Sequence, residues 1–124
     1  MFLQNKNVVV MGVANKKSIA WGCAKALKDQ GANVIYTYQN ERMKKQVVKL
    51  ADENDLLVEC DVASDASIQA AFETIKNEVG TIDGLVHAIA FAKKEELSGN
   101  VSDITRDGFL LAQDISSYSL LAVT

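Results

Sequence analysis

The chain has 124 residues, enough for one small domain, and its 48% hydrophobic and 23% charged residues are typical of a folded protein rather than a disordered one. The net charge of −3 provides no basic stripe, which argues against nucleic acid as a partner. Two widely separated cysteines and one histidine argue against a metal site, and without a signal-type start or a long apolar run we expect a cytoplasmic protein that does not enter a membrane.

Strands and helices are predicted to alternate along the chain. Short apolar runs predict four strands, at residues 7–13, 33–38, 56–60 and 83–91. Apolar residues at helical spacing predict four helices, at about residues 18–30, 43–50 and 64–79 and from about 105 onward. This alternation predicts an α/β fold, a partial Rossmann-like doubly wound parallel sheet of about four strands with flanking helices. No repeat or linker interrupts it, so we expect a single dinucleotide-binding domain over residues 1–124.

The turn after the first strand is where this fold class binds phosphate groups. It reads Gly12-Val13-Ala14-Asn15-Lys16-Lys17-Ser18-Ile19-Ala20 and lacks the common GxGxxG pattern. Gly12 allows a close approach of the backbone to a pyrophosphate, while Ser18 and the amides around Ile19 stand at a helix start. Taken alone, Ser18 is explained equally well as a plain helix cap without a ligand.

A glycine followed by five residues and Ser-Ile-Ala resembles the turn of bacterial NADH-dependent enoyl-[acyl-carrier-protein] reductases, a divergent branch of the short-chain dehydrogenase/reductase superfamily. Further similar motifs follow in the same order as far as Ser119, including Cys60-Asp61-Val62 and the stretch from His87 to Ala92. The resemblance implies NAD as cofactor and a substrate contact at Ala92. It implies cofactor contacts at Gly12, Ser18, Ile19, Gln39, Asp61, Val62 and Ile89.

Cofactor preference is suggested by the residues after the second strand. Members of the family that favour NADPH tend to place arginine or lysine directly after the tyrosine, whereas this sequence continues Tyr38-Gln39-Asn40-Glu41. The resemblance therefore implies that NADH is preferred over NADPH. The strand lacks the usual terminal acidic residue that binds the ribose, which is a departure from the general pattern. As an isolated aspartate, Asp61 is equally typical of a turn at a strand end.

The resemblance implies hydride transfer from NADH to the β-carbon of a trans-2-enoyl thioester on acyl carrier protein, in type II fatty acid biosynthesis, by a homotetramer. In the family a tyrosine stabilises the developing enolate, and a lysine seven positions later binds the nicotinamide ribose. Tyr38 and Lys45 have that spacing, but they follow the second strand, on the adenosine side. We therefore assign no catalytic residue and expect this chain alone to be an inactive cofactor platform.

Other interpretations remain open. The chain could be a non-catalytic NAD-binding or interaction module, while the turn argues against a carbonyl reductase of a sister branch. His87 is interpreted as a structural histidine rather than an acid or base. Because the family's later strands are missing from this sequence, we also expect Leu85, Val86 and Ile89 to lie on a strand with an open edge.

Overall fold

The computed structural model describes all residues from Met1 to Thr124 and divides into two compact units, Met1–Ala88 and Ile89–Thr124. The first unit contains β1 (Asn7–Met11), α1 (Ile19–Asp29), β2 (Asn33–Tyr38), α2 (Glu41–Val48), β3 (Leu56–Glu59), α3 (Asp65–Val79) and β4 (Gly84–His87). The second contains two 3₁₀ turns, a helix, a π-helical segment and a last helix: η1 (Lys94–Leu97), η2 (Val101–Asp103), α4 (Arg106–Gln113), η3 (Asp114–Tyr118) and α5 (Ser119–Val123). A single domain over residues 1–124 stays a prediction.

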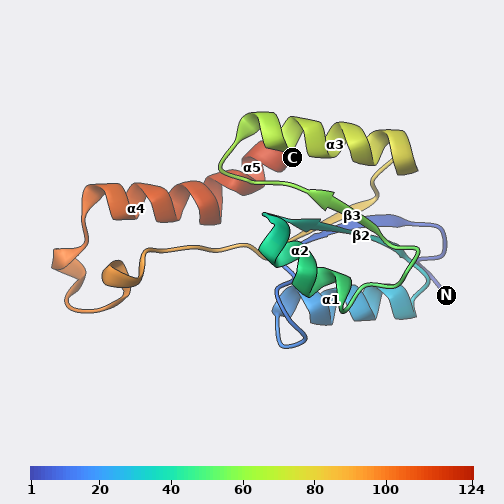
Figure 1. Cartoon of the computed structure of the whole chain (residues 1–124), viewed down its shortest axis with the longest axis horizontal. Coiled ribbons are helices and arrows are strands. Elements are labelled where there is room, and N and C mark those ends of the chain that lie inside the picture. The colour runs from blue at the N-terminus through green and yellow to red at the C-terminus, as the bar shows by residue number, and fades with distance from the viewer. The chain divides into compact units, whose positions relative to one another are not determined.

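The four strands of the first unit form one parallel sheet in the order β3-β2-β1-β4. Val9 of β1 pairs with Ile35 of β2 on one side and with Leu85 of β4 on the other. Helices α1 and α2 lie against one face of this sheet and α3 against the other (Figure 1). The predicted α/β, Rossmann-like arrangement of a parallel sheet with helices on both faces is confirmed.

The core is built on β1 and β2, whose side chains are buried on both faces of the sheet. One cluster joins the face of Val10 and Tyr36 to Ala24 of α1 and Val47 of α2. Strand neighbours that point the other way, such as Val9 and Met11, are fully buried as well. Covering both faces explains why these strands appear in the sequence as continuous apolar runs rather than alternating ones.

Three strands are shorter than predicted: β3 by one residue, and β1 and β4 by more, each for a local reason. β1 ends at Met11 because Gly12 has a φ of +107°, which takes the backbone out of the extended region. β4 ends at His87 rather than Phe91 because β1 is its only partner, and the last bond of that ladder joins the amide of Ala88 to the carbonyl of Met11 at 3.1 Å. Every residue of β4 is only half-buried, as expected for a strand at the sheet edge.

The second unit has little core of its own. Its buried residues are Gly108, Ser119 and Val123. Many large apolar side chains in it are exposed, namely Phe91, Leu97, Val101, Ile104, Phe109, Leu110, Tyr118, Leu120 and Leu121.

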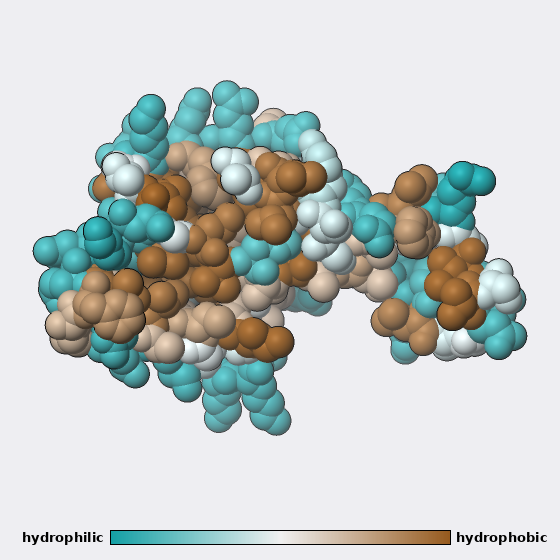
Figure 2. Space-filling view, turned by 180° about the vertical axis from the view of Figure 1, so that it is seen from behind, coloured by the Kyte–Doolittle hydropathy of each residue, from teal (hydrophilic) through white to brown (hydrophobic).

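Figure 2 shows broad hydrophobic areas bordered by hydrophilic side chains on the side of the molecule seen there. None of the helices has both the length and the hydrophobicity that a transmembrane segment requires.

Candidate functional site

The carboxyl ends of the four parallel strands meet at one rim of the sheet. Thr37 of β2 and His87 of β4 both pair with Met11, and the amide of Cys60 donates to the carbonyl of Tyr38 at 2.8 Å. The turns that follow these strands therefore begin side by side. Six of the predicted cofactor contacts lie in these turns or at the helix start that follows the first turn. They are Gly12, which opens the first turn, and Ser18, Ile19, Gln39, Asp61 and Val62.

The fold itself requires glycine at position 12, whether or not a ligand binds there. A Cβ added at this position would lie 2.1 Å from the carbonyl oxygen of Ala88, and the positive φ of +107° disfavours any side chain. The sequence suggested glycine here because a pyrophosphate must come close. The structure adds a second reason, because the turn after β1 presses against the backbone at the end of β4.

The prediction that Ser18 caps α1 is half right. Its backbone is extended and occupies the N-cap position, but its side chain makes no capping bond to the helix. Instead the Ser18 hydroxyl donates to the carbonyl of Asn15 at 2.7 Å and accepts from the amide of Ala14 at 3.4 Å. The side chain of Asn15 in turn accepts from the amide of Lys17 at 2.8 Å. The polar side chains of the turn thus bond within the turn, and the helix start is left uncapped by Ser18.

The start of α1 differs from the other helix starts of comparable length. Three helices have both a side-chain cap and an acidic residue in the first turn: α2 with Asn40 and Glu41, α3 with Ser64 and Asp65, and α4 with Thr105 and Asp107. α1 has neither, and its first residue, Ile19, is 81% exposed. Free amides and the positive end of the helix dipole are therefore accessible, as an anion site requires.

The turn after β2 holds the residues predicted to lie near the adenosine ribose. Gln39 is exposed, while the side chain of Asn40 accepts from the amide of Met43 at 3.0 Å and caps α2. Glu41 follows in the first turn of that helix. The ring of Tyr38 has the ammonium group of Lys44 at 5.7 Å from its centroid. Tyr38 and Lys45 match the family's catalytic tyrosine and lysine only in their spacing along the sequence.

Asp61 has a structural role at the end of β3. Its Oδ1 accepts from the amide of Ala63 at 3.0 Å, and its own amide donates to the hydroxyl of Ser67 at 2.8 Å. Val62 beside it is half-buried. The neighbouring Cys60 is buried, and burial, followed by the charge of Asp61, raises the pKa of its thiol to about 11. Cys60 is therefore a packing residue rather than a nucleophile.

Ile89 and Ala92 lie in the second unit, in the irregular segment after β4, and both are half-buried. Between them, Phe91 is bonded through its backbone to the hydroxyl of Ser116 in η3, a contact that no sequence pattern indicated. His87, the last residue of β4, forms an interaction within the chain. No group of three or more His, Cys, Asp or Glu side chains is arranged to hold a metal ion.

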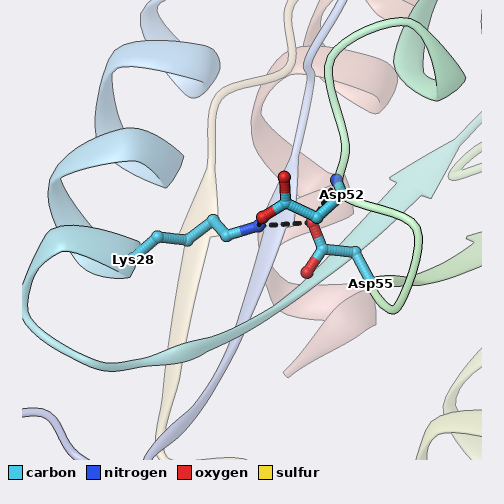
Figure 3. Close-up of polar contacts among 3 residues, drawn as sticks. All are labelled: Lys28, Asp52 and Asp55. Atoms are coloured by element: carbon cyan, nitrogen blue, oxygen red, sulfur yellow. Dashed lines mark hydrogen bonds and ion pairs between the residues drawn. The ribbon is translucent and has the colours of Figure 1, made fainter.

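A second polar cluster missed by the sequence lies away from this rim. Lys28, in the last turn of α1, forms ion pairs with Asp52 and with Asp55, the latter at 2.6 Å (Figure 3). Both aspartates come from the loop that leads into the amino end of β3. Burial lowers the pKa of Lys28, but the hydrogen bonds to Asp52 and Asp55 outweigh it and raise the value. This cluster connects α1 to the loop before β3 and does not belong to the candidate site.

Comparison with known proteins supplies the family. The curated relatives include an enoyl-[acyl-carrier-protein] reductase [NADH] from Bacillus subtilis, 55% identical over 98% of this chain, and one named for NADPH from Staphylococcus aureus, 50% identical over 98%. A crystal structure of the Bacillus cereus enoyl-acyl carrier protein reductase with NADP⁺ and indole naphthyridinone superimposes over 98% of the chain with a TM-score of 0.92 and 52% identity.

These matches cover this chain almost completely but only part of each relative. The chain spans about half the length of the curated relatives it matches, 48% and 49% for the two named above. The sequence model described as enoyl-(acyl carrier protein) reductase matches residues 12–124. The chain belongs to the enoyl-(acyl carrier protein) reductase family.

Proposed function

We propose that the first unit binds NADH with the pyrophosphate at the start of α1. The observation that carries this proposal is the helix start itself, which lacks both the side-chain cap and the acidic residue found at α2, α3 and α4. An acidic first turn would repel a pyrophosphate, whereas free amides and a helix dipole attract it. Lys16 and Lys17, both exposed in the turn, add positive charge beside it.

Each predicted contact has a role in this proposal. Gly12, Ser18 and Ile19 hold the pyrophosphate side, and Gln39 meets the adenosine ribose. Asp61 and Val62 border the adenine, where Asp61 still has a carboxylate oxygen beyond the Oδ1 that Ala63 uses. Ile89 contacts the nicotinamide end and Ala92 the substrate. The family relation supports these assignments because the relatives are named for reduction with NADH or NADPH.

We further infer that the complete enzyme reduces the double bond of a trans-2-enoyl thioester carried on acyl carrier protein. NADH, when bound, supplies the hydride for the β-carbon. This chain's part is to bind and orient the cofactor; the group that stabilises the enolate oxygen lies outside its 124 residues. A cytoplasmic location remains a prediction from the sequence, and a homotetramer remains a prediction from the family resemblance.

A preference for NADH over NADPH is the finer part of the proposal. Gln39 is exposed and uncharged, the side-chain oxygen of Asn40 is used in capping α2, and Glu41 brings a negative charge next to them. A 2′-phosphate at this turn would meet a carboxylate and no cation within the first three residues. The relatives named for NADPH and NADH show that the family itself uses both cofactors.

Calorimetric titration of the chain with NADH and NADPH tests the binding proposal. We expect NADH to bind about tenfold more tightly, because a carboxylate near the 2′-phosphate costs roughly that factor at low salt. Gln39→Arg should reverse the preference. Asn54→Arg, which adds the same charge at an exposed position before β3, should leave it unchanged. Failure of the chain to bind either dinucleotide would contradict the proposal.

Turnover separates the reductase from the alternative of a binding module without catalysis. The chain alone should bind NADH and show no oxidation of it with a crotonyl thioester. Joined to the second half of the Bacillus subtilis relative, it should catalyse that oxidation. Binding that persists in the joined polypeptide without any reduction of enoyl thioesters would favour the module.

A further inference from the structure

The helical stretch at the end of the chain contains an unusual turn. After α4 the backbone widens into the π-helical segment η3 (Asp114–Tyr118) before α5 resumes. A π-helical turn forms i→i+5 bonds in place of i→i+4 bonds, is rare, and is frequently found at functional sites. The sequence predicted one uninterrupted helix here, so the turn is a feature to explain. The residue it places in contact with another segment is Ser116.

The Ser116 hydroxyl bonds to both backbone groups of one residue. It accepts from the amide of Phe91 at 3.0 Å and donates to the carbonyl of Phe91 at 3.3 Å. A serine hydroxyl has a single proton to donate, and here that proton and one lone pair are both directed at the same residue. The segment around Phe91 has no strand or helix to hold it, since β4 ends at His87 and η1 begins at Lys94.

We propose that Ser116 is a positioning residue for the acyl end of the reductase site. This inference rests on the proposed function, in which Ala92 contacts the enoyl thioester. By fixing both backbone groups of Phe91, Ser116 sets the orientation of the peptide that leads directly into Ala92. Ser116 does not touch the substrate; it acts through the backbone that does. The π-helical turn is the local structure that presents its hydroxyl to Phe91.

Neighbouring residues provide matched controls. Ser117 lies in the same π-helical turn and is exposed, and no bond to Phe91 involves it. Ser116→Ala removes the hydroxyl with little change of volume, Ser116→Thr keeps it, and Ser117→Ala makes the same deletion one residue away. A general weakening of the helix affects both alanine variants alike, whereas a positioning role affects only the first.

The contact is tested in the chain itself by amide hydrogen exchange at Phe91. Loss of one hydrogen bond should speed exchange of this amide by about tenfold in Ser116→Ala. Ser116→Thr and Ser117→Ala should both exchange at the rate of the unchanged chain. Equal exchange at Phe91 in Ser116→Ala and the unchanged chain would overturn the positioning role, whatever the chain's function.

The functional consequence is tested in the polypeptide joined to the Bacillus subtilis half. Ser116→Ala should raise KM for the enoyl thioester by about tenfold, because a displaced backbone loses contacts to the substrate. KM for NADH should stay unchanged, and Ser116→Thr should restore the enoyl value. An equal rise in both KM values, or an equal rise in Ser117→Ala, would overturn the proposal. Absence of NADH oxidation in the unchanged joined polypeptide would instead contradict the proposed function.

Discussion

Where the strands of the first unit begin, side chains bond across the molecule, and where the strands end, they bond within their own turn. At the amino ends, Asn7 accepts from Asn33 at 3.2 Å and donates to the carbonyl of Thr81 at 2.9 Å, while its amide bonds Asp83 at 2.8 Å. The Lys28 cluster lies at the same rim. At the carboxyl ends, Ser18 bonds only to residues three and four positions away.

The difference separates stability from binding. Long-range polar contacts at the amino rim join β1, β2, α1 and the loops before β3 and β4, so they hold the unit together. Short-range contacts at the carboxyl rim only shape turns and leave the start of α1 open. Ligands of this fold class bind at the carboxyl rim. We therefore expect substitutions at the amino rim to change stability alone, and substitutions in the turn that leads into α1 at the carboxyl rim to change dinucleotide affinity.

The largest effect is expected where the two roles coincide, at Gly12. Gly12→Ala places a Cβ 2.1 Å from the carbonyl oxygen of Ala88 and requires a positive φ of +107° for alanine. Backbone strain and a backbone clash together should lower the free energy of unfolding by at least about 3 kcal/mol. Urea denaturation followed by circular dichroism measures this. NADH affinity of the folded fraction should also fall.

Gly22 is the matched control for that substitution. It lies in α1, and a Cβ there has no neighbour within 4 Å. Gly22→Ala should therefore raise stability by about 0.5–1 kcal/mol, because alanine is the better helix former. Similar destabilisation by both substitutions would show that the contact between Gly12 and Ala88 has no special importance.

The second prediction concerns alkaline pH. Burial, followed by the charge of Asp55, raises the pKa of Tyr36 from 10.0 to about 12, so the folded chain holds this proton more tightly than the unfolded chain. Stability should be complete below pH 10 and should fall by about 2–3 kcal/mol as pH rises from 10 to 12. The raised pKa of Lys28 acts in the same direction above 10.5.

Tyr36→Phe separates the two contributions. The Tyr36 hydroxyl is buried without a hydrogen-bond partner, so its removal should raise stability at neutral pH by about 1 kcal/mol. The alkaline loss should shrink to the part that Lys28 contributes. Urea midpoints measured from pH 8 to pH 11.5 by circular dichroism give both results. An unchanged alkaline slope in Tyr36→Phe would refute the assignment to Tyr36.

The third prediction tests the amino rim directly. Asp55→Asn should lower stability by about 1–2 kcal/mol, because its side chain is only 13% exposed and its loss leaves Lys28 with one exposed partner. Asp52 is 73% exposed, so Asp52→Asn should cost less than about 0.5 kcal/mol. Thermal unfolding measures both. Neither variant should change NADH affinity. A clear loss of affinity would contradict the assignment of stability to the amino rim and of binding to the carboxyl rim.

Most of the fold could be predicted from the sequence because local pattern and tertiary burial agree. The bounds of β2 were predicted to the residue, since an apolar run there follows the turn at Gly31 and ends at polar Gln39. β4 was predicted too long, because its end depends on the length of its partner β1. The apolar residues after His87 resemble a strand locally, but no neighbouring strand remains to pair with them.

The candidate site could be predicted as a set of positions but not as a set of bonds. Gly12, Ser18 and Asp61 were identified from motifs, yet the bond of Ser18 back to Asn15 has no sequence signal. Ser116 was missed because its partner lies 25 positions away and the π-helical turn has no recognisable pattern. Long-range polar contacts of this kind, like that of Lys28 to Asp55, emerge only when the elements are packed.

The smallest effect is expected for substitutions of two serines that precede helices at the carboxyl rim. Ser64 is a true cap, because its hydroxyl accepts from the amide of Ser67 at 3.2 Å, whereas Ser18 makes no capping bond. Ser64→Ala should cost about 1 kcal/mol of stability with unchanged NADH affinity. Ser18→Ala should cost less than half of that, yet weaken NADH binding by about tenfold, because the turn is no longer held in shape beneath the pyrophosphate.

Thermal unfolding and calorimetric titration of the two variants show whether the loss of stability or affinity depends on the position of the serine at the rim or on the bond that its hydroxyl makes. If both substitutions lowered stability equally and neither changed NADH affinity, Ser18 would be a structural residue only, and the uncapped start of α1 would not explain binding. The expected crossed result, in which one serine affects only stability and the other mainly affinity, has a single physical cause. A hydroxyl that bonds to its helix satisfies the amides there, and one that bonds back into the turn leaves them free for an anion.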